Sequence, residues 1–94
     1  MNEVLFFEGQ TANVTTPWVV VYGDYSLLLG GTFGTAKFHL EVKQVGADNA
    51  TALKVDNQDY DAPDTPRFTP GHVEVRAVLE TVDGTTSVTA KLVR

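Results

Sequence analysis

Cysteine is absent from this sequence. The chain can therefore form no disulfide scaffold, no thiol nucleophile and no cysteine-ligated zinc site. It also lacks any apolar run of about 18 residues, the length that crosses a bilayer, so we expect no membrane partner. The basic and apolar stretch of a secretory signal peptide is missing from the first residues, so we expect a small soluble domain without a secretory leader.

Positive charge is scarce as well. Lys and Arg number 7 against 12 Asp and Glu, which gives a net charge of −5 at pH 7. Because an acidic surface repels phosphate backbones, we expect no nucleic-acid partner. The 94 residues suffice for one hydrophobic core, and no change of composition marks a boundary. We therefore expect a single β domain over residues 1–94.

Strand-forming residues dominate what is present. The chain contains 14 Val and 12 Thr, whose β-branched side chains favour strands. Apolar residues do not recur with the helical spacing over three turns. Glycine and proline separate short runs of alternating residues. This pattern predicts an all-β fold, a small antiparallel β-sandwich or barrel of about six to eight strands, Ig-like or jelly-roll-like and built from sequential hairpins.

Two hairpins are predicted from turn residues and alternation. Asp83-Gly84 is a strong two-residue turn signal, and a turn there pairs residues 72–82 with residues 85–93. That register sets Leu79 opposite Val88 and Ala77 opposite Ala90, as a one-sided core requires. A turn at Phe33-Gly34 pairs residues 25–32 with residues 35–42 in the same way. The residues expected in the core are Leu27, Leu29, Phe38, Leu40, Ala77, Leu79, Val88 and Ala90.

The N-terminal run Leu5-Phe6-Phe7 lies in a predicted strand, Val4 to Glu8. Three consecutive large apolar residues in a strand point to both of its faces. A single core covers one face, so the other needs a second sheet or another protein chain, and both alternatives remain open. We expect residues 1–8 to act as an N-terminal interaction strand that adds to the sheet edge of a neighbouring molecule.

The other predicted elements are shorter. Strands are expected at residues 18–22, 51–55 and 67–69, with an exposed loop over the rest of 56–71. Acidic residues from Asp56 to Asp61 resemble an oxygen-rich calcium loop but lack the glycine and glutamate of an EF-hand. A solvated, self-repelling loop is favoured instead, and no metal or other cofactor is expected.

No nucleophile, base and orienting group can be assembled from the sequence, so we expect no enzyme and no catalytic residue. His39 and His72 lie at strand positions next to apolar residues, and both are interpreted as sheet-surface residues. Trp18 and Tyr22 alternate on one strand and therefore share a face. They either stack on sugar rings or form a buried aromatic pair, and burial is favoured.

A longer pattern resembles a known class of proteins. Residues 27–42, with Gly31-Thr32-Phe33-Gly34 between two alternating runs, and residues 71–88, with Asp83-Gly84, are similar to segments of small tailed-phage virion proteins. The resemblance covers about residues 20–94. Where such proteins keep a glycine-rich turn between the two segments, this chain has an Asp- and Pro-rich stretch. The class includes capsid decoration (cement) proteins and small tail or neck proteins, and it implies no catalytic residues.

The resemblance implies a protein of the virion, assembled in the host cytoplasm, that stabilises contacts between capsomers. Its partner would be the major capsid protein or another virion protein, and it would form a homo-oligomer on the virion. An acidic surface suits the outside of a shell, away from packaged DNA. The alternatives are a small tail or neck component and a carbohydrate-binding or adhesion module that uses Trp18, Tyr22 or Tyr60. The residues expected at the contact are Leu5, Phe6, Phe7, Trp18, Asp59 and Asp61.

Overall fold

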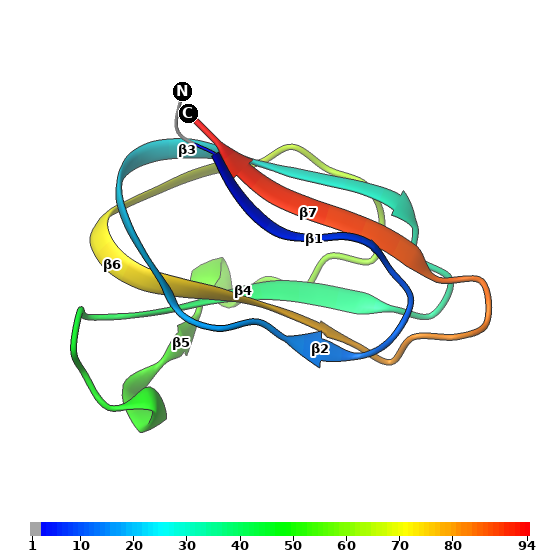
Figure 1. The fold of residues 1–94 in the computed structure, drawn as a ribbon, viewed down its shortest axis with the longest axis horizontal. Helices are drawn as coiled ribbons and strands as arrows, with labels where there is room; N and C mark the ends of the chain where they lie inside the picture. Colours follow the sequence, from blue (N-terminus) through cyan, green and yellow to red (C-terminus); the bar gives the residue numbers. More distant parts are fainter. Residues whose placement is uncertain (1–2) are drawn as a thin grey trace.

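The computed structural model describes residues 3–94 and contains seven antiparallel strands joined in one hydrogen-bonded sheet (Figure 1). The prediction of a small antiparallel all-β fold of the sandwich or barrel type is confirmed. No helix in this part of the chain is long and apolar enough to cross a bilayer. The strands are β1 (Glu3–Gln10), β2 (Val14–Thr15), β3 (Val19–Thr32), β4 (Lys37–Lys43), β5 (Leu53–Lys54), β6 (Arg67–Glu80) and β7 (Ser87–Val93), with 3₁₀ turns η1 (Asn49–Thr51) and η2 (Val55–Asn57).

The long strands β3 and β6 bend and pass from one layer to the other (Figure 1). The second half of β3 pairs with β7, which in turn pairs with β1. The first half of β3 pairs with β6, whose second half pairs with β4 and β2. At the bend Gly23 lies opposite Gly71, with φ of 106° and 79°. Only glycine adopts such angles without strain, so this glycine pair lets both strands turn at the same place.

The core lies between the two layers and takes its side chains from the inward positions of β3, β4, β6 and β7. All the residues predicted for it are buried, which confirms the inward face of each strand. Phe38 and Ala77 are completely buried, and Leu27 is 1% exposed. Phe7 of β1 joins the same cluster, its ring 6.0 Å from that of Phe38 in an edge-on arrangement.

The predicted hairpin of residues 72–82 with 85–93 is wrong. The neighbours of β7 are β1 and β3, whereas β6 pairs with β2, β3 and β4. Residues 81–86 therefore carry the chain from one layer to the other, and Leu79 and Val88 face the same core from opposite layers. A hairpin and such a crossing put the same alternate residues into the core, so the apolar pattern cannot distinguish them.

The predicted hairpin of residues 25–32 with 35–42 is wrong for the same reason. In this range β3 pairs with β7, and β4 pairs with β6. A tight turn closed by the Ala36 amide, which donates to the Phe33 carbonyl at 2.9 Å, crosses between the layers. Phe33 is a poor residue for a surface turn, but at this crossing its side chain is buried and fills a position in the core.

The two crossings contact each other. The Thr86 hydroxyl donates to the Phe33 carbonyl at 2.8 Å, and the Thr35 amide donates to Asp83 Oδ2 at 3.1 Å. The Thr35 hydroxyl donates to the Thr81 carbonyl at 2.6 Å. Hydrogen bonds from the hydroxyl and amide of Thr85, together with the Thr35 amide, lower the pKa of Asp83. The carboxylate of Asp83 thus links the Gly34 turn to the Gly84 turn.

The shorter elements follow the predictions in part. A strand forms over residues 3–10 as expected, β3 begins at Val19, and the strand expected at 51–55 shrinks to Leu53–Lys54 between two 3₁₀ turns. The brief strand expected at 67–69 is the start of the long β6. The loop before it is tied down by paired backbone bonds of Tyr60 with Phe38 and of Asp64 with Leu29. This loop therefore bridges β4 and β3.

Replacing Leu40 by alanine is expected to lower the free energy of unfolding by about 2–5 kcal/mol, the usual cost of emptying a core leucine site. Leu53→Ala is the matched control, because Leu53 is 70% exposed whereas Leu40 is 3% exposed. Urea unfolding should leave the control within about 0.5 kcal/mol of the parent chain. Equal losses for the two variants would contradict the core described above.

Gly34→Ala is expected to destabilise the chain by more than about 1 kcal/mol, since Gly34 has φ of 59° and a side chain there would overlap the Asp83 carboxylate. Gly84→Ala tests the neighbouring turn, where a Cβ meets open space. Thermal unfolding should show a clear loss for Gly34→Ala alone. A similar loss of thermal stability for Gly84→Ala would contradict the conclusion that Gly34 is needed for the contact between the two crossings.

Candidate functional site

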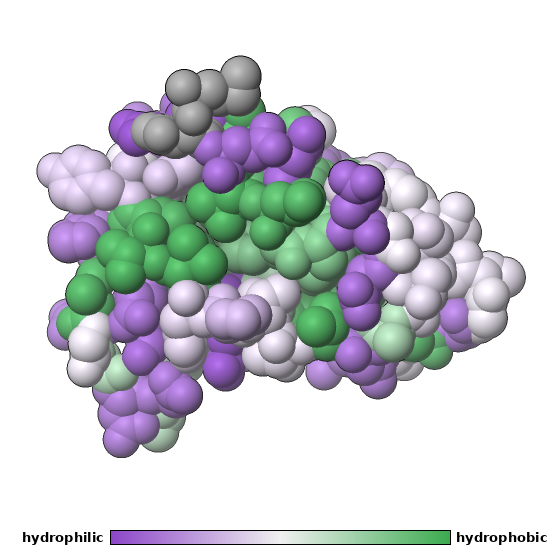
Figure 2. Space-filling model, viewed as in Figure 1, coloured by the Kyte–Doolittle hydropathy of each residue, from purple (hydrophilic) through white to green (hydrophobic). Residues whose placement is uncertain are grey.

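Hydrophobic side chains gather on one side of the molecule, over β1 and the first part of β3 (Figure 2). Leu5 is 52% exposed, a large fraction for a side chain of this kind. Val4, Phe6 and Val19 are half-buried beside the core. These four residues are called the β1 surface below. An exposed hydrophobic surface on a small domain marks a contact with another molecule.

The structure separates the three N-terminal apolar residues. Leu5 lies opposite Lys91 and Phe7 opposite Ala90, so Phe6 occupies a bulge between them. The bulge lets Phe7 enter the core while Leu5 points outward. The chain's own core therefore covers one face of this segment, and Leu5 stays open to solvent. Residues 3–8 of the predicted interaction strand belong to the chain's own sheet, and residues 1 and 2 lie outside the described residues.

Strand β1 is an edge strand, with β7 as its neighbour in the part of the chain that the structure describes. Its register shifts twice, between Leu5 and Phe7 and between Phe7 and Gln10. Glu3 and Glu8 lie toward its two ends. Bulges and charges are devices by which edge strands avoid pairing with other chains. The β1 surface is thus better suited to contact through side chains than to addition of a further strand.

A second group of side chains covers the outer face of β4 and β6. Three cross-strand pairs of opposite charge share this face, with His39 opposite Val78 between the first and the second, and are called the charged ladder: Lys37–Glu80, Glu41–Arg76 and Lys43–Glu74. Arg76 Nε donates to Glu41 Oε1 at 2.7 Å, and Lys43 Nζ lies 3.4 Å from Glu74 Oε2. The Gly46 amide, which donates to Glu74 at 2.8 Å, is the main cause of a lowered pKa at Glu74.

Trp18 packs on this ladder instead of forming a buried pair with Tyr22, so the favoured interpretation of those two rings is wrong. Arg76 lies 4.4 Å and Lys43 5.0 Å from the centre of the Trp18 ring. Tyr22 is 67% exposed and packs against His72, 5.4 Å away between ring centres. Cations over a tryptophan face are favourable contacts. The outward face of early β3 therefore belongs to the ladder, not to the core.

His39 is buried, 5% exposed, although it was expected on the sheet surface. Its Nε2 lies 2.9 Å from Glu41 Oε2, and its Nδ1 lies 3.6 Å from Asp59 Oδ1. No hydrogen-bond partner for Nδ1 is found among residues 3–94. The spacing of His39 and Glu41, two residues apart on one strand, was a signal for this contact that the sequence interpretation missed. His72 is exposed as predicted.

Asp59 and Asp61 lie on the segment that crosses over β4. Lys54 Nζ donates to Asp59 Oδ1 at 2.9 Å, and Lys37 Nζ donates to Asp61 Oδ2 at 3.3 Å. The hydrogen bond from Lys54 is the main reason why the pKa of Asp59 is lowered, with the charge of His39 acting in the same direction. Within residues 3–94 no three His, Asp or Glu side chains are grouped so that they could hold a metal ion.

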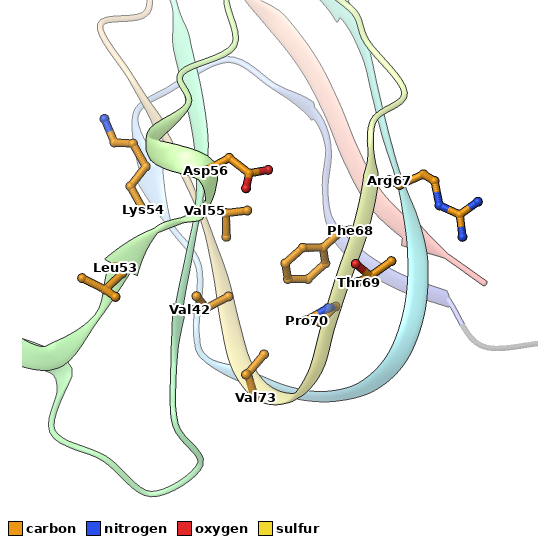
Figure 3. A pocket seen from close by; sticks show the side chains of 10 residues that line it. All are labelled: Val42, Leu53, Lys54, Val55, Asp56, Arg67, Phe68, Thr69, Pro70 and Val73. Atoms are coloured by element: carbon orange, nitrogen blue, oxygen red, sulfur yellow. The ribbon is translucent and has the colours of Figure 1, made fainter.

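A groove of about 370 Å³ opens between β5 with η2 and the start of β6 (Figure 3). Apolar side chains form its walls, among them Val42, Val55, Phe68 and Val73. Lys54 and Arg67 stand at its rim with their charged ends turned away from the opening (Figure 3). Its walls come from three segments far apart in the sequence, which is why no local pattern predicted it.

The residues predicted for one interface are therefore spread over separate places. Leu5 and Phe6 lie on the β1 surface, while Phe7 lies in the core. Trp18 joins the charged ladder, which reaches Asp59 through Glu41 and His39, and Asp61 pairs with Lys37 beside it. No model of a protein family matches the chain, and no curated protein or solved structure shows a significant similarity to it.

Burial raises the pKa of Glu41, but hydrogen bonds from His39 and Arg76 outweigh it, and the net result is a pKa below the ordinary 4.5. A carboxylate of this kind stabilises the folded state above its unfolded pKa, and this stability is lost as the pH falls through the lower folded value. Glu41→Gln is therefore expected to lower the midpoint of thermal unfolding at pH 7. The difference from the parent chain should shrink once the pH falls below 4.5.

Glu80→Gln is the control for that measurement, because Glu80 belongs to the same ladder but is exposed. Its thermal midpoint should stay close to that of the parent chain at every pH. A constant gap between Glu41→Gln and the parent chain from pH 7 down to about pH 3 would contradict the role given to the Glu41 charge.

Proposed function

We propose that this chain is a structural protein of a phage virion, most specifically a capsid decoration protein that attaches to the outside of the shell. The observation that carries the proposal is the β1 surface, where Leu5 is 52% exposed beside the half-buried Val4 and Phe6. A side chain such as Leu5 gains roughly 1.5–3 kcal/mol when it is fully buried. Burial against a second protein supplies that stabilisation.

The attachment is expected to occur through side chains of the β1 surface. Leu5 and Phe6 would enter apolar depressions of the shell protein, and the bulges of β1 would keep its free edge from recruiting further copies. A stable contact buries about 1,200–2,000 Å² in total. Many copies on one lattice strengthen attachment further, so each contact needs only modest affinity.

Charge and chemistry fit the same role. The net charge of −5 disfavours contact with packaged DNA and suits a position on the outer side of a shell. The lack of cysteine makes the fold independent of the redox state of its surroundings. The Gly-Thr-Phe-Gly and Asp-Gly segments, on which the resemblance to virion proteins rests, form the two linked layer crossings, so their residue types serve the fold directly.

A carbohydrate-binding module is the second candidate function. Of the three aromatic rings considered for sugar stacking, Trp18 is occupied by Arg76 and Lys43, and Tyr60 packs against Phe38 with 6.4 Å between ring centres. Tyr22 keeps 67% of its surface exposed and supports this candidate alone. A single ring beside His72 provides a smaller platform than the β1 surface provides for a protein.

Co-sedimentation tests the first candidate. The purified chain is mixed with shells assembled from the capsid protein encoded near its gene, produced without the chain itself, and the bound fraction is measured at increasing concentration. The parent chain should sediment with the shells, and Leu5→Asn should weaken binding by at least about tenfold, as expected for a residue central to a contact. Genes around this one that encode no virion protein would refute the proposal at once.

Leu53→Asn is the matched control, because Leu53 is 70% exposed but lies on the far edge of the sheet at the groove. It should bind shells as the parent chain does. If Leu53→Asn loses binding and Leu5→Asn keeps it, the groove and not the β1 surface is the contact. If the parent chain ignores shells but is retained by a glycan column in a Tyr22-dependent way, the carbohydrate candidate replaces the proposal.

A further inference from the structure

His39 is held between two carboxylates that belong to different elements. Glu41 lies on the same strand, with its Oε2 at 2.9 Å from His39 Nε2. Asp59 lies on the segment of residues 58–64, called the acidic segment below, with its Oδ1 at 3.6 Å from His39 Nδ1. The imidazole is almost completely screened from water, since its side chain is 7% exposed. It thus contacts one carboxylate of its own strand and one of the acidic segment, and Lys37 on β4 and Lys54 on β5 reach the same segment through Asp61 and Asp59.

Few other contacts tie the acidic segment to the sheet. Tyr60 and Phe38 exchange two backbone hydrogen bonds of 2.7 and 2.8 Å, and Asp64 and Leu29 exchange two of 3.0 Å. The Tyr60 ring packs on Phe38, and Lys54 and Lys37 pair with Asp59 and Asp61. The other residues of the segment are exposed, so each of these ion pairs, including the one that a charged His39 would add, contributes to holding the segment in place.

The neutral and the protonated imidazole of His39 form different hydrogen bonds. A carboxylate only accepts hydrogen bonds, so the short contact with Glu41 places a hydrogen on Nε2. In the neutral imidazole Nδ1 then carries a lone pair that faces the negative Asp59 oxygen, which is unfavourable. In the protonated imidazole Nδ1 also carries a hydrogen, and it donates to Asp59 as a charge-assisted hydrogen bond.

We propose that His39 is a proton-controlled latch that fastens the acidic segment onto β4 when its ring is charged and loosens it when the ring is neutral. The latch follows from the geometry of the ring, whose two nitrogens face carboxylates of two different elements. Loosening leaves Lys54 as the cation that holds Asp59 and weakens the neighbouring contact of the Tyr60 ring with Phe38. The latch is independent of the function proposed above.

Other charges around the ring modulate the latch but do not replace it. Lys54 holds Asp59 from the side of β5, and Arg76 holds Glu41 from β6. The hydrogen bond from Lys54 lowers the pKa of Asp59, which favours the charged carboxylate that a protonated His39 would bind. The charged groups that surround His39 are Glu41 and Lys37 on β4, Arg76 on β6, Lys54 on β5, and Asp59 and Asp61 on the acidic segment.

Nuclear magnetic resonance of the full ¹⁵N-labelled chain between about pH 5 and pH 8 tests the latch. Long-range ¹H–¹⁵N spectra follow the charge of His39, with exposed His72 as an internal reference. Amide hydrogen exchange, corrected for its intrinsic pH dependence, follows the opening of Tyr60. Protection of the Tyr60 amide should fall about two- to fivefold as His39 loses its proton, the range expected for one partly exposed ion pair.

Two conservative variants separate the latch from a general effect of acidity. Asp59→Asn should make Tyr60 protection independent of the charge of His39, because the carboxylate that a charged ring would bind is gone. Asp61→Asn, two residues away and paired with Lys37, should behave like the parent chain. Both residues are exposed, so both variants should fold. Tyr60 protection that ignores the charge of His39, or equal behaviour of the two variants, would overturn the proposal.

Discussion

The contact between the two layer crossings is the constraint on which the rest of the structure depends. Asp83 accepts hydrogen bonds from both crossings, and Thr86 and Thr35 donate across to the opposite one. Because β4 and β7 each begin directly after a crossing, this contact sets where both strands enter their layers. Every later pairing, including that of β7 with β1, follows from those starting points.

The outer faces follow from the same arrangement. Placing β4 beside β6 aligns three pairs of opposite charge, and the ladder gives Trp18 a surface on which to pack. The other edge of β4 pairs with β5 at Glu41 and Val42 and with Tyr60 at Phe38, and this second pairing brings Asp59 to His39.

The proposed roles use opposite properties of the molecule. Attachment uses the β1 surface. Leu5 lies outside there, because the bulge at Phe6 turns the side chain of Phe7 into the core instead. The latch uses a buried ring between two carboxylates. Attachment depends on a second protein that displaces water from exposed apolar side chains. The latch depends on a ring that the chain itself already shields from water. They lie on different elements, so either can exist without the other.

The sequence by itself determined which residues of each strand are buried, because alternation in an extended chain assigns side chains to faces regardless of the neighbour. Leu27, Phe38, Leu79 and Ala90 could therefore be placed in the core, and Leu5 could be given an uncovered face. The partners of each strand were decided by tertiary structure alone, since a hairpin and a layer crossing satisfy the same alternation. The contact of His39 with Asp59, the charged ladder and the groove could not be predicted, because each joins segments that only the strand order brings together.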